Sequence, residues 1–200
     1  MVRAMTATKQ AHITVEDYFA LEEKEADIRH EYYDGEVITM TGTSKPHNII
    51  VLNLALALRQ RLKGGYCRVF MENVRLEVEG GRHYTYPDVM VTCDGRDRAD
   101  DYNVRYPVLV VEVLSDSTEA LDRGKKASQY RKLPTLQEYV LVSQSECGVE
   151  LFSRSQAPSW TLTELSAPDS VLNLSCLNLQ IPLSEIYEGI QFQEEEGVNG

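Results

Sequence analysis

The amino-acid sequence predicts an α/β fold in which helices flank a mixed β-sheet. Helical segments stand both before and after a group of strand-like segments, which is the arrangement this fold class requires. The run from Val108 to Leu114 is almost entirely aliphatic, as in a strand that is covered on both faces. No internal repeat or low-complexity linker interrupts the chain. We therefore expect one domain over residues 1–200, with a core at about 14–145 and a C-terminal hairpin and tail at 146–200.

The first predicted elements are a short helix and a hairpin. Thr14 can cap the helix, and acidic residues follow it in the first turn, where the free N–H groups favour negative charge. We expect the apolar side of this helix to face inward through Val15, Phe19 and Leu21. The dipeptide Asp34-Gly35 then predicts a tight type I′ turn between the two strands of HEYYDGEVITM.

A longer second helix follows the hairpin. Ser44 and Pro46 suit its start, and Gly64-Gly65 suit its end. Its apolar residues recur at helical spacing and predict the side that is buried. These residues are Ile49, Leu52, Ala55 and Leu56.

The rest of the chain alternates between strand-like segments and one further helix. Alternating or continuous apolar residues predict strands at 67–70, 73–79, 83–94, 108–114 and 138–143. A helix is expected from about 118 to 132. A small hairpin made of 148–154 and 160–165 and a closing segment at 177–187 complete the chain.

The charge balance and the termini restrict the class of protein. The chain carries 31 acidic and 20 basic residues, for a formal net charge of -11. This balance argues against a protein that coats polyanions generally, although it is compatible with a local basic groove. The N-terminal segment lacks the apolar core of a secretory signal, and the longest apolar run is too short to span a bilayer. We expect a cytoplasmic protein with no membrane partner.

The four cysteines are scattered through the sequence at Cys67, Cys93, Cys147 and Cys176. They form no CxxC pair and have no histidine at metal-ligand spacing, so a structural zinc site is not expected. In a chain without a secretory signal, the simplest expectation is that all four are reduced thiols.

Two acidic residues fall within apolar strand-like segments. Glu112 lies inside VVEVL and Asp88 lies inside YPDVMV. A buried carboxylate without a partner costs several kcal/mol, so Glu112 requires a partner. If the two strands are neighbours, both carboxylates reach one end of the sheet, where a shared Mg²⁺ or Mn²⁺ would relieve their repulsion. Taken alone, Asp88 is more typical of a turn residue at a strand end.

The segment after Glu112 supplies a cation. Asp122, Lys126 and Tyr130 are spaced at i, i+4 and i+8, which places them on one side of a helix. A lysine in this position can orient an attacking water or stabilise negative charge on a phosphate. The alternative for Asp122 and Lys126 is an ordinary ion pair on a helix surface.

Two further polar residues are candidates for the same site. Glu31 lies beside the predicted hairpin, where the alternative is an ordinary surface charge. His47 lies at the start of the second helix, where a polar residue is common without any role as a ligand. Both residues depend on the combination with Asp88 and Glu112 for their interpretation.

These segments occur in an order that resembles a known family. YPDVMV, VVEVLSDST, LDRGKKASQY and PTLQEYVLV follow one another as in the "putative restriction endonuclease" family, formerly catalogued as a domain of unknown function, in the PD-(D/E)xK nuclease superfamily. RHEYYDGEVITM and the following His47 extend the resemblance, which covers roughly residues 14–142. The resemblance implies a restriction-endonuclease-like core and Mg²⁺-dependent hydrolysis of phosphodiester bonds.

The resemblance also implies roles for individual residues. Asp88 matches the aspartate of the PD motif and Glu112 the acidic residue of the third motif, so both would bind the metal ion. Glu31 resembles an acidic residue that superfamily members often carry on or after the first helix. The superfamily lysine usually lies two positions after the acidic residue, where this chain has Leu114. Its counterpart would then lie on the next helix, as Lys126.

The expected function is a metal-dependent DNA endonuclease with Asp88, Glu112 and Lys126 as catalytic residues. Lys125, next to Lys126, is an alternative for the lysine. A homodimer is expected if both strands of a duplex are cut. The alternative function is a non-catalytic nucleic-acid-binding or regulatory module that retains the nuclease fold. The sequence does not separate DNA from RNA, and it shows no base-reading motif such as a helix-turn-helix or a zinc finger.

Overall fold

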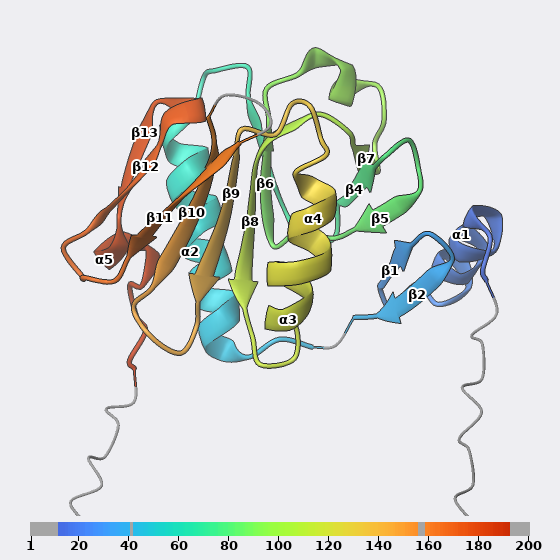
Figure 1. Cartoon of the computed structure of the whole chain (residues 1–200), viewed down its shortest axis with the longest axis horizontal. Helices are drawn as coiled ribbons and strands as arrows, with labels where there is room; N and C mark the ends of the chain where they lie inside the picture. The colour runs from blue at the N-terminus through green and yellow to red at the C-terminus, as the bar shows by residue number, and fades with distance from the viewer. Residues whose placement is uncertain (1–11, 41, 156–158, 193–200) are drawn as a thin grey trace, which may run out of the picture.

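The computed structural model describes residues 12–40, 42–155 and 159–192. Two β-sheets form most of it, with the first helix at one end of the molecule and the last helix at the other (Figure 1). The larger sheet has the strand order β11-β10-β9-β8-β6-β3. Its strands are β3 (Arg68–Met71), β6 (Val89–Thr92), β8 (Pro107–Leu114), β9 (Glu138–Ser143), β10 (Val149–Arg154) and β11 (Trp160–Leu165).

The larger sheet is mixed, as the sequence predicts. β8 and β9 run parallel, with Glu112 opposite Leu141, and the other neighbouring pairs run antiparallel. β8 therefore lies inside the sheet between β9 and β6, which explains its aliphatic sequence. β10 pairs with β9, so the C-terminal hairpin of β10 and β11 continues the same sheet.

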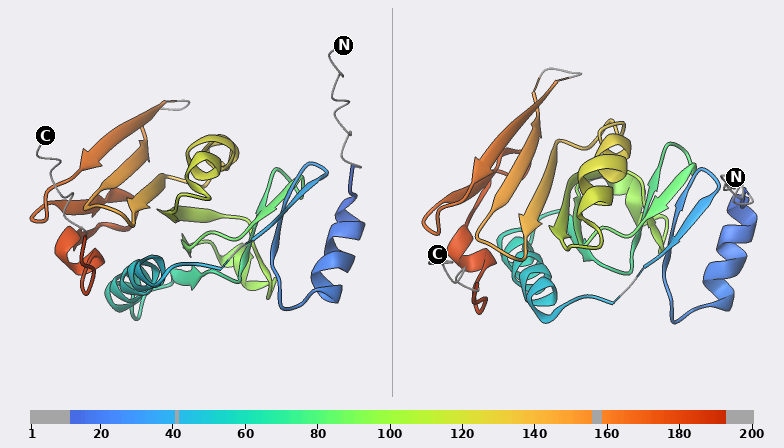
Figure 2. Two further views of the ribbon diagram at one scale, coloured as in Figure 1. Left: turned by 90° about the horizontal axis from the view of Figure 1, so that it is seen from below. Right: turned by 60° about the horizontal axis from the view of Figure 1, so that its bottom comes forward.

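Helices cover both faces of the larger sheet (Figure 2). α2 packs on one face together with the odd-numbered residues of β8 from 109 to 113. α4 packs on the other face with Val110 and Leu114. Because side chains alternate along a strand, Glu112 points to the face that α4 covers.

The helices are α1 (Val15–Lys24), α2 (Lys45–Arg61), α3 (Glu119–Leu121), the π-turn η2 (Asp122–Lys126), α4 (Ala127–Tyr130) and α5 (Leu183–Ile186), with 3₁₀ turns η1 (Gly95–Arg98) and η3 (Ser175–Leu177).

The second helix begins after its predicted cap, Ser44, but it turns a different side to the sheet than the spacing suggests. Leu52 and Leu56, expected to be buried, are 54 % and 52 % exposed. The buried side is instead centred on Leu54 and Leu58. Apolar residues occupy more than one side of this helix, so their spacing alone did not define the packed side.

The smaller sheet has the order β2-β1-β5-β4-β7, and α1 packs on it through an aromatic cluster that includes Tyr18. The predicted turn Asp34–Gly35 joins β1 to β2 with φ values of 48° and 95°, as two positive-φ positions require. The buried residues of α1 are Tyr18 and Glu22, whereas Leu21, expected to face inward, is half-buried. The strands are β1 (His30–Tyr33), β2 (Glu36–Thr39), β4 (Arg75–Val78), β5 (His83–Thr85) and β7 (Asn103–Val104).

The C-terminal segment adds a third, two-stranded sheet. β12 (Val171–Leu174) pairs with β13 (Leu179–Pro182), and α5 follows directly. Leu172, Ile181 and Leu183 join the core that α2 forms with the larger sheet. None of the described helices is long and apolar enough to cross a membrane.

The prediction that all four cysteines are reduced thiols is wrong. Cys67 and Cys93 form a disulfide, while Cys147 and Cys176 are free. Cys67 directly precedes β3 and Cys93 directly follows β6, and the antiparallel register of these strands places the two residues opposite each other. Their pairing depends on this strand contact across 26 residues of sequence, which the cysteine spacing does not reveal.

Candidate active site

Asp88 and Glu112 meet where β6 begins beside β8. Asp88 stands directly before β6, and not within a strand as expected. Its backbone N–H donates to Oε2 of Glu112 at 3.2 Å, and the N–H of Val113 donates to Oδ2 of Asp88 at 2.7 Å. These reciprocal hydrogen bonds hold both carboxylates at one end of the strand pair.

Lys126 is the cation that reaches Glu112. Its Nζ lies 3.2 Å from Oε1 of Glu112, 3.1 Å from Oε1 of Glu31 and 3.2 Å from Oδ1 of Asp122. All four side chains are buried. The contact with Glu112 is a hydrogen bond, whereas those with Glu31 and Asp122 are ion pairs. The sequence predicted a metal ion shared with Asp88 as the partner of Glu112, and the structure adds this lysine as a cationic partner within the protein.

Tyrosine side chains complete the hydrogen bonding of these carboxylates. The hydroxyl of Tyr130 donates to Oε1 of Glu112 at 2.8 Å, and the hydroxyl of Tyr33 donates to Oε2 of Glu31 at 2.7 Å. The backbone N–H of Tyr86 donates to Oε1 of Glu31 at 3.1 Å. The sequence did not point to Tyr33 or Tyr86, because a tyrosine in a strand is more often a packing residue.

The helix that carries Lys126 is interrupted by the π-turn η2. The carbonyl of Asp122 accepts the N–H of Ala127, five residues further on. In a regular α-helix, Tyr130 would be rotated by about 80° from Asp122 about the helix axis. A π-turn holds more residues per turn and reduces this rotation. Asp122, Lys126 and Tyr130 therefore face the site together, although not through the regular spacing assumed from the sequence.

Lys125 points away from the site. Its ammonium pairs with Glu36 and lies 4.3 Å from the centre of the Tyr33 ring. The Lys125 side chain is 33 % exposed, against 6 % for Lys126. Of the two lysines left open by the sequence, the structure brings Lys126 to the carboxylates.

His47 enters the site from the first turn of α2. Its backbone N–H donates to Oγ of the capping Ser44 at 3.2 Å, and its Nε2 lies 3.4 Å from Oδ2 of Asp88. The ring is buried, and its Nδ1 has no hydrogen-bond partner among the described residues. Burial is the largest single influence and would lower the pKa of His47, but Asp88, with smaller contributions from Glu72 and the backbone of Val113, raises the pKa above its ordinary value. His47 is thus both a helix-start residue and a neighbour of the candidate metal ligand.

Burial and neighbouring opposite charges shift the pKa values of Glu112 and Lys126 in opposite directions. Burial raises the pKa of Glu112 well above its ordinary value, against the opposing effect of Lys126. Burial is also the main cause of the raised pKa of Asp122. For Lys126, burial would lower the pKa, but the surrounding groups, led by Glu112 and Glu31, together outweigh it and raise the pKa well above its ordinary value. The ammonium stays charged, and the carboxylates around it outnumber it.

The cluster lines a cavity of about 420 Å³. Tyr130 reaches Glu112 from the core side, and the other candidate residues face the cavity itself. These are Glu31, His47, Asp88, Glu112, Asp122 and Lys126. The structure thus brings together all seven candidates that the sequence singled out.

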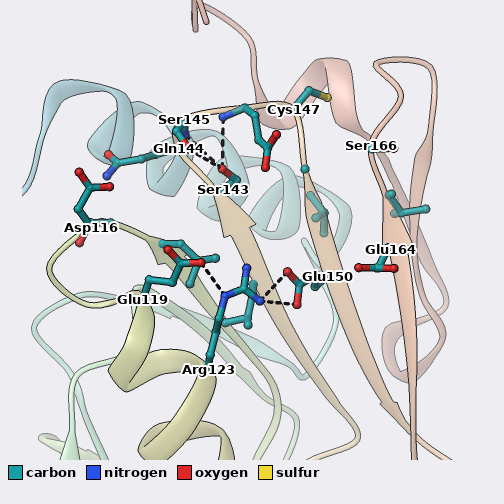
Figure 3. Close-up of a pocket in the computed structure, with 17 residues that line it drawn as sticks. Asp116, Glu119, Arg123, Ser143, Gln144, Ser145, Cys147, Glu150, Glu164 and Ser166 are labelled. Carbon is teal, nitrogen blue, oxygen red and sulfur yellow. Dashed lines mark hydrogen bonds and ion pairs between the residues drawn. The ribbon is translucent and has the colours of Figure 1, made fainter. Parts of the chain in front are cut away.

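A second hollow of about 290 Å³ adjoins this cavity and shares Asp116 and Gln144 with it (Figure 3). Its basic residue, Arg123, pairs with Glu119 and Glu150 at 2.7 and 2.6 Å. The charge of Arg123 is therefore already balanced, and the reactive grouping belongs to the larger cavity.

The donors in the larger cavity suit a hard divalent cation. Carboxylates from Glu31, Asp88, Glu112 and Asp122, with Asp116 at the rim, line it against the single ammonium of Lys126. Within the described residues, no group of three or more His, Cys, Asp or Glu side chains is arranged as a ready-made metal cage. Mg²⁺ commonly binds one or two protein carboxylates and keeps several waters, a requirement that Asp88 and Glu112 meet.

A comparison with models of protein families shows which family the chain belongs to. The model of the Uma2 family, described as "Putative restriction endonuclease", matches residues 15–184. The chain belongs to the Uma2 family. The match includes both large sheets and the complete site, so the family resemblance seen in the sequence is confirmed.

Curated relatives of this Uma2 protein come from a cyanobacterium. Uncharacterized protein slr1290 of Synechocystis sp. is 38 % identical over 180 residues, which cover 90 % of this chain and 94 % of the relative. Uncharacterized protein sll1609 of the same organism is 32 % identical over 169 residues, covering 84 % of this chain and 95 % of the relative.

A solved structure shares the fold. The crystal structure of "a putative nuclease belonging to DUF820" from Anabaena variabilis is similar with a TM-score of 0.73 and 20 % sequence identity. The similarity covers 88 % of this chain and 97 % of that chain. The predicted restriction-endonuclease-like fold, a mixed sheet flanked by helices, is therefore confirmed.

Proposed function

We propose that this Uma2 protein is a divalent-metal-dependent nuclease that hydrolyses phosphodiester bonds in DNA. The buried contact between Lys126 and Glu112, placed beside Asp88 in one cavity, is the observation that carries the proposal. The family description supports a nucleic-acid substrate. An excess of carboxylates would repel a phosphodiester, so the site requires a cation to accept one.

Each acidic or basic residue has a defined task in this proposal. Asp88 and Glu112 would hold Mg²⁺ or Mn²⁺. When bound, such a cation supplies positive charge next to a phosphate and makes a nearby water more acidic. Lys126 places a permanent positive charge beside Glu112. This positive charge would stabilise the negative charge that develops on the phosphate. Glu31 and Asp122 fix the Lys126 ammonium through their ion pairs.

Two further side chains orient the carboxylates. Tyr130 holds Glu112 through its hydroxyl, and His47 lies against Asp88. Lys45 starts the same helix as His47, so it is the basic residue of α2 best placed for a neighbouring phosphate. Arg61 lies at the other end of α2, about 24 Å away at 1.5 Å per residue, and pairs with Glu185.

The alternative is a non-catalytic nucleic-acid-binding or regulatory module. It is favoured by one observation, because three buried carboxylates already surround the Lys126 ammonium and compete with a phosphate for its charge. The formal net charge of -11 points in the same direction. A module of this kind binds nucleic acid without cutting it and has no need of a metal ion.

Cleavage of supercoiled plasmid DNA tests the proposal. The full chain is incubated with the plasmid in the presence of Mg²⁺, of Mn²⁺ or of a chelator. In a second assay, cleavage of a linear DNA is compared with cleavage of an RNA of the same length, to identify which nucleic acid is cut. We expect cleavage by the wild type with either metal ion and none by Asp88→Asn. Asp116→Asn is the matched control, because Asp116 is an exposed residue at the rim of the same cavity. Equal activity of Asp88→Asn and the wild type contradicts the proposal.

A metal titration separates the nuclease from the alternative. A ligand that binds only the folded chain stabilises it by about 2.7 kcal/mol at a hundred times its dissociation constant. We expect Mn²⁺ to raise the melting temperature of the wild type and of Asp116→Asn, but not that of Asp88→Asn. DNA binding without cleavage and without a Mn²⁺ effect supports the non-catalytic module.

We also propose that the nuclease acts as a homodimer. Cutting both strands of a duplex is most simply done by two sites related by twofold symmetry. Light scattering coupled to size-exclusion chromatography, with and without a duplex and Mg²⁺, measures the state directly. A monomer under all conditions contradicts this part of the proposal.

A further inference from the structure

Tyr139 lies behind the candidate site and contacts two of its parts. It is a residue of β9, next to β8 in the larger sheet. Its hydroxyl donates to the backbone carbonyl of Asp122 at 3.0 Å, and its ring meets that of Tyr130 edge-on at a centroid distance of 5.4 Å. Tyr139 is 1 % exposed and does not line the cavity, so it cannot touch a substrate there.

The carbonyl that Tyr139 contacts is the one that closes the π-turn. It accepts the N–H of Ala127, whereas in a regular α-helix it would accept the N–H of Lys126. A carbonyl oxygen has two lone pairs, so it can accept from Ala127 and from Tyr139 together. The Tyr139 hydroxyl therefore fixes this carbonyl from outside the helix.

The π-turn determines where Lys126 lies. Glu31 belongs to β1, Glu112 to β8 and Asp122 to the turn itself, and all three carboxylates approach the ammonium within 3.1 to 3.2 Å. Tightening the turn to an α-helical one would rotate Lys126 relative to Asp122 about the helix axis. The ammonium would then lose its simultaneous contact with the three carboxylates.

We propose that Tyr139 is a positioning residue whose hydroxyl holds the π-turn open and thereby keeps Lys126 against Glu31 and Glu112. Its effect on turnover rests on the proposed nuclease function, whereas its effect on Lys126 does not. Burial raises the pKa of Tyr139 well above its ordinary value, so its hydroxyl stays a donor across the working pH range.

Tyr139→Phe tests this role, with Tyr32→Phe as the matched control. The Tyr32 hydroxyl also donates to a backbone carbonyl, that of Ile13, at 3.0 Å, and Tyr32 is 3 % exposed on the smaller sheet. Each variant keeps its ring and loses one hydrogen bond, buried for Tyr139 and partly buried for Tyr32, so we expect a decrease in melting temperature for both. Amide hydrogen exchange over residues 123–128 should be roughly five- to tenfold faster in Tyr139→Phe and unchanged in Tyr32→Phe.

Chemical labelling reports the position of the lysine without any assay of activity. Acetic anhydride is reacted with each folded protein, and acetylation is measured at Lys125 and Lys126 by mass spectrometry. Lys126 should react faster in Tyr139→Phe than in the wild type or Tyr32→Phe. Lys125, which is partly exposed, should react equally in all three and serves as the internal reference.

Turnover provides the third measurement. We expect Tyr139→Phe to lower kcat about tenfold with little change in KM, because a displaced lysine weakens charge stabilisation but not substrate contacts. If the wild type cuts no nucleic acid, the proposed nuclease fails, and exchange and labelling still decide the role of Tyr139. Unchanged labelling of Lys126 in Tyr139→Phe overturns the positioning role, as does an unchanged kcat where the wild type is active.

Discussion

Lys126 is a structural cation as well as a candidate catalytic one. Removing it as Lys126→Ala leaves Glu31, Glu112 and Asp122 buried without their counter-charge, so we expect a loss of about 3–5 kcal/mol in unfolding free energy. Lys125→Ala removes a partly exposed ion pair and should cost about 1 kcal/mol or less. Urea denaturation of both variants at pH 7 measures the difference, and equal losses would mean that Lys126 is not bound in this way.

The cysteine residues give a second test at the same scale. Two thiols, Cys147 and Cys176, are free, and the other two of the four cysteines form the disulfide between β3 and β6. Thiol titration of the denatured, unreduced chain should therefore find two reactive groups, rising to four after reduction. Four thiols before reduction would contradict the disulfide.

The sequence identified charged site residues better than their neutral supports. Glu112 was recognisable because a carboxylate in an aliphatic strand is costly. Lys126 was recognisable because it lies four residues after Asp122 and four residues before Tyr130. Tyr139 gave no signal, since a buried aromatic residue in a strand is ordinary. Its role depends on a hydrogen bond between separate elements, and such pairings are set by the tertiary structure.

At the scale of elements, α2 shows where periodicity stops being informative. Apolar residues lie on several sides of this helix, and contact with the larger sheet selects the side that contains Leu54. We expect Leu54→Ala to lose about 2–5 kcal/mol of stability, as for other buried leucines. Leu52→Ala, at a position that is 54 % exposed, should change stability by about 0.5 kcal/mol or less. Chemical denaturation of the two variants measures these losses. A larger loss for Leu52→Ala than for Leu54→Ala would mean that the side expected from the spacing is the buried one.

Other elements followed from local chemistry alone. The turn at Asp34-Gly35 needs two residues of positive φ, and the aliphatic run of β8 needs cover on both faces, so both were predictable. The π-turn was not, because no residue type specifies one. Gly124 is the one local hint within DRGKKASQY, since glycine costs about 1 kcal/mol relative to alanine in an α-helix and weakens the regular form.

At the scale of the molecule, residues from both sheets, from the first turn of α2 and from the α3–η2 segment line one cavity. The fold class and the mixed sheet were predictable from the order of strands and helices. The continuation of the sheet through β10 and β11 was not, because a hairpin's partner strand lies outside its own sequence. In the proposed function, the excess of carboxylates over the Lys126 ammonium in this cavity makes a bound cation the condition for approach of a phosphodiester.

Glu112 is the residue on which the proposed chemistry most depends, and one rate tests it directly. Mg²⁺-dependent cleavage of plasmid DNA is measured for Glu112→Gln and for Glu138→Gln. Both glutamates are 2 % exposed and lie on neighbouring strands, but Glu138 accepts hydrogen bonds from the backbone of Ser175 and Cys176 and does not line the cavity. We expect Glu112→Gln to lower the rate on the order of 10²–10³-fold while Glu138→Gln stays close to the wild type. Cleavage by Glu112→Gln at the wild-type rate would contradict the assignment of this cavity as the active site.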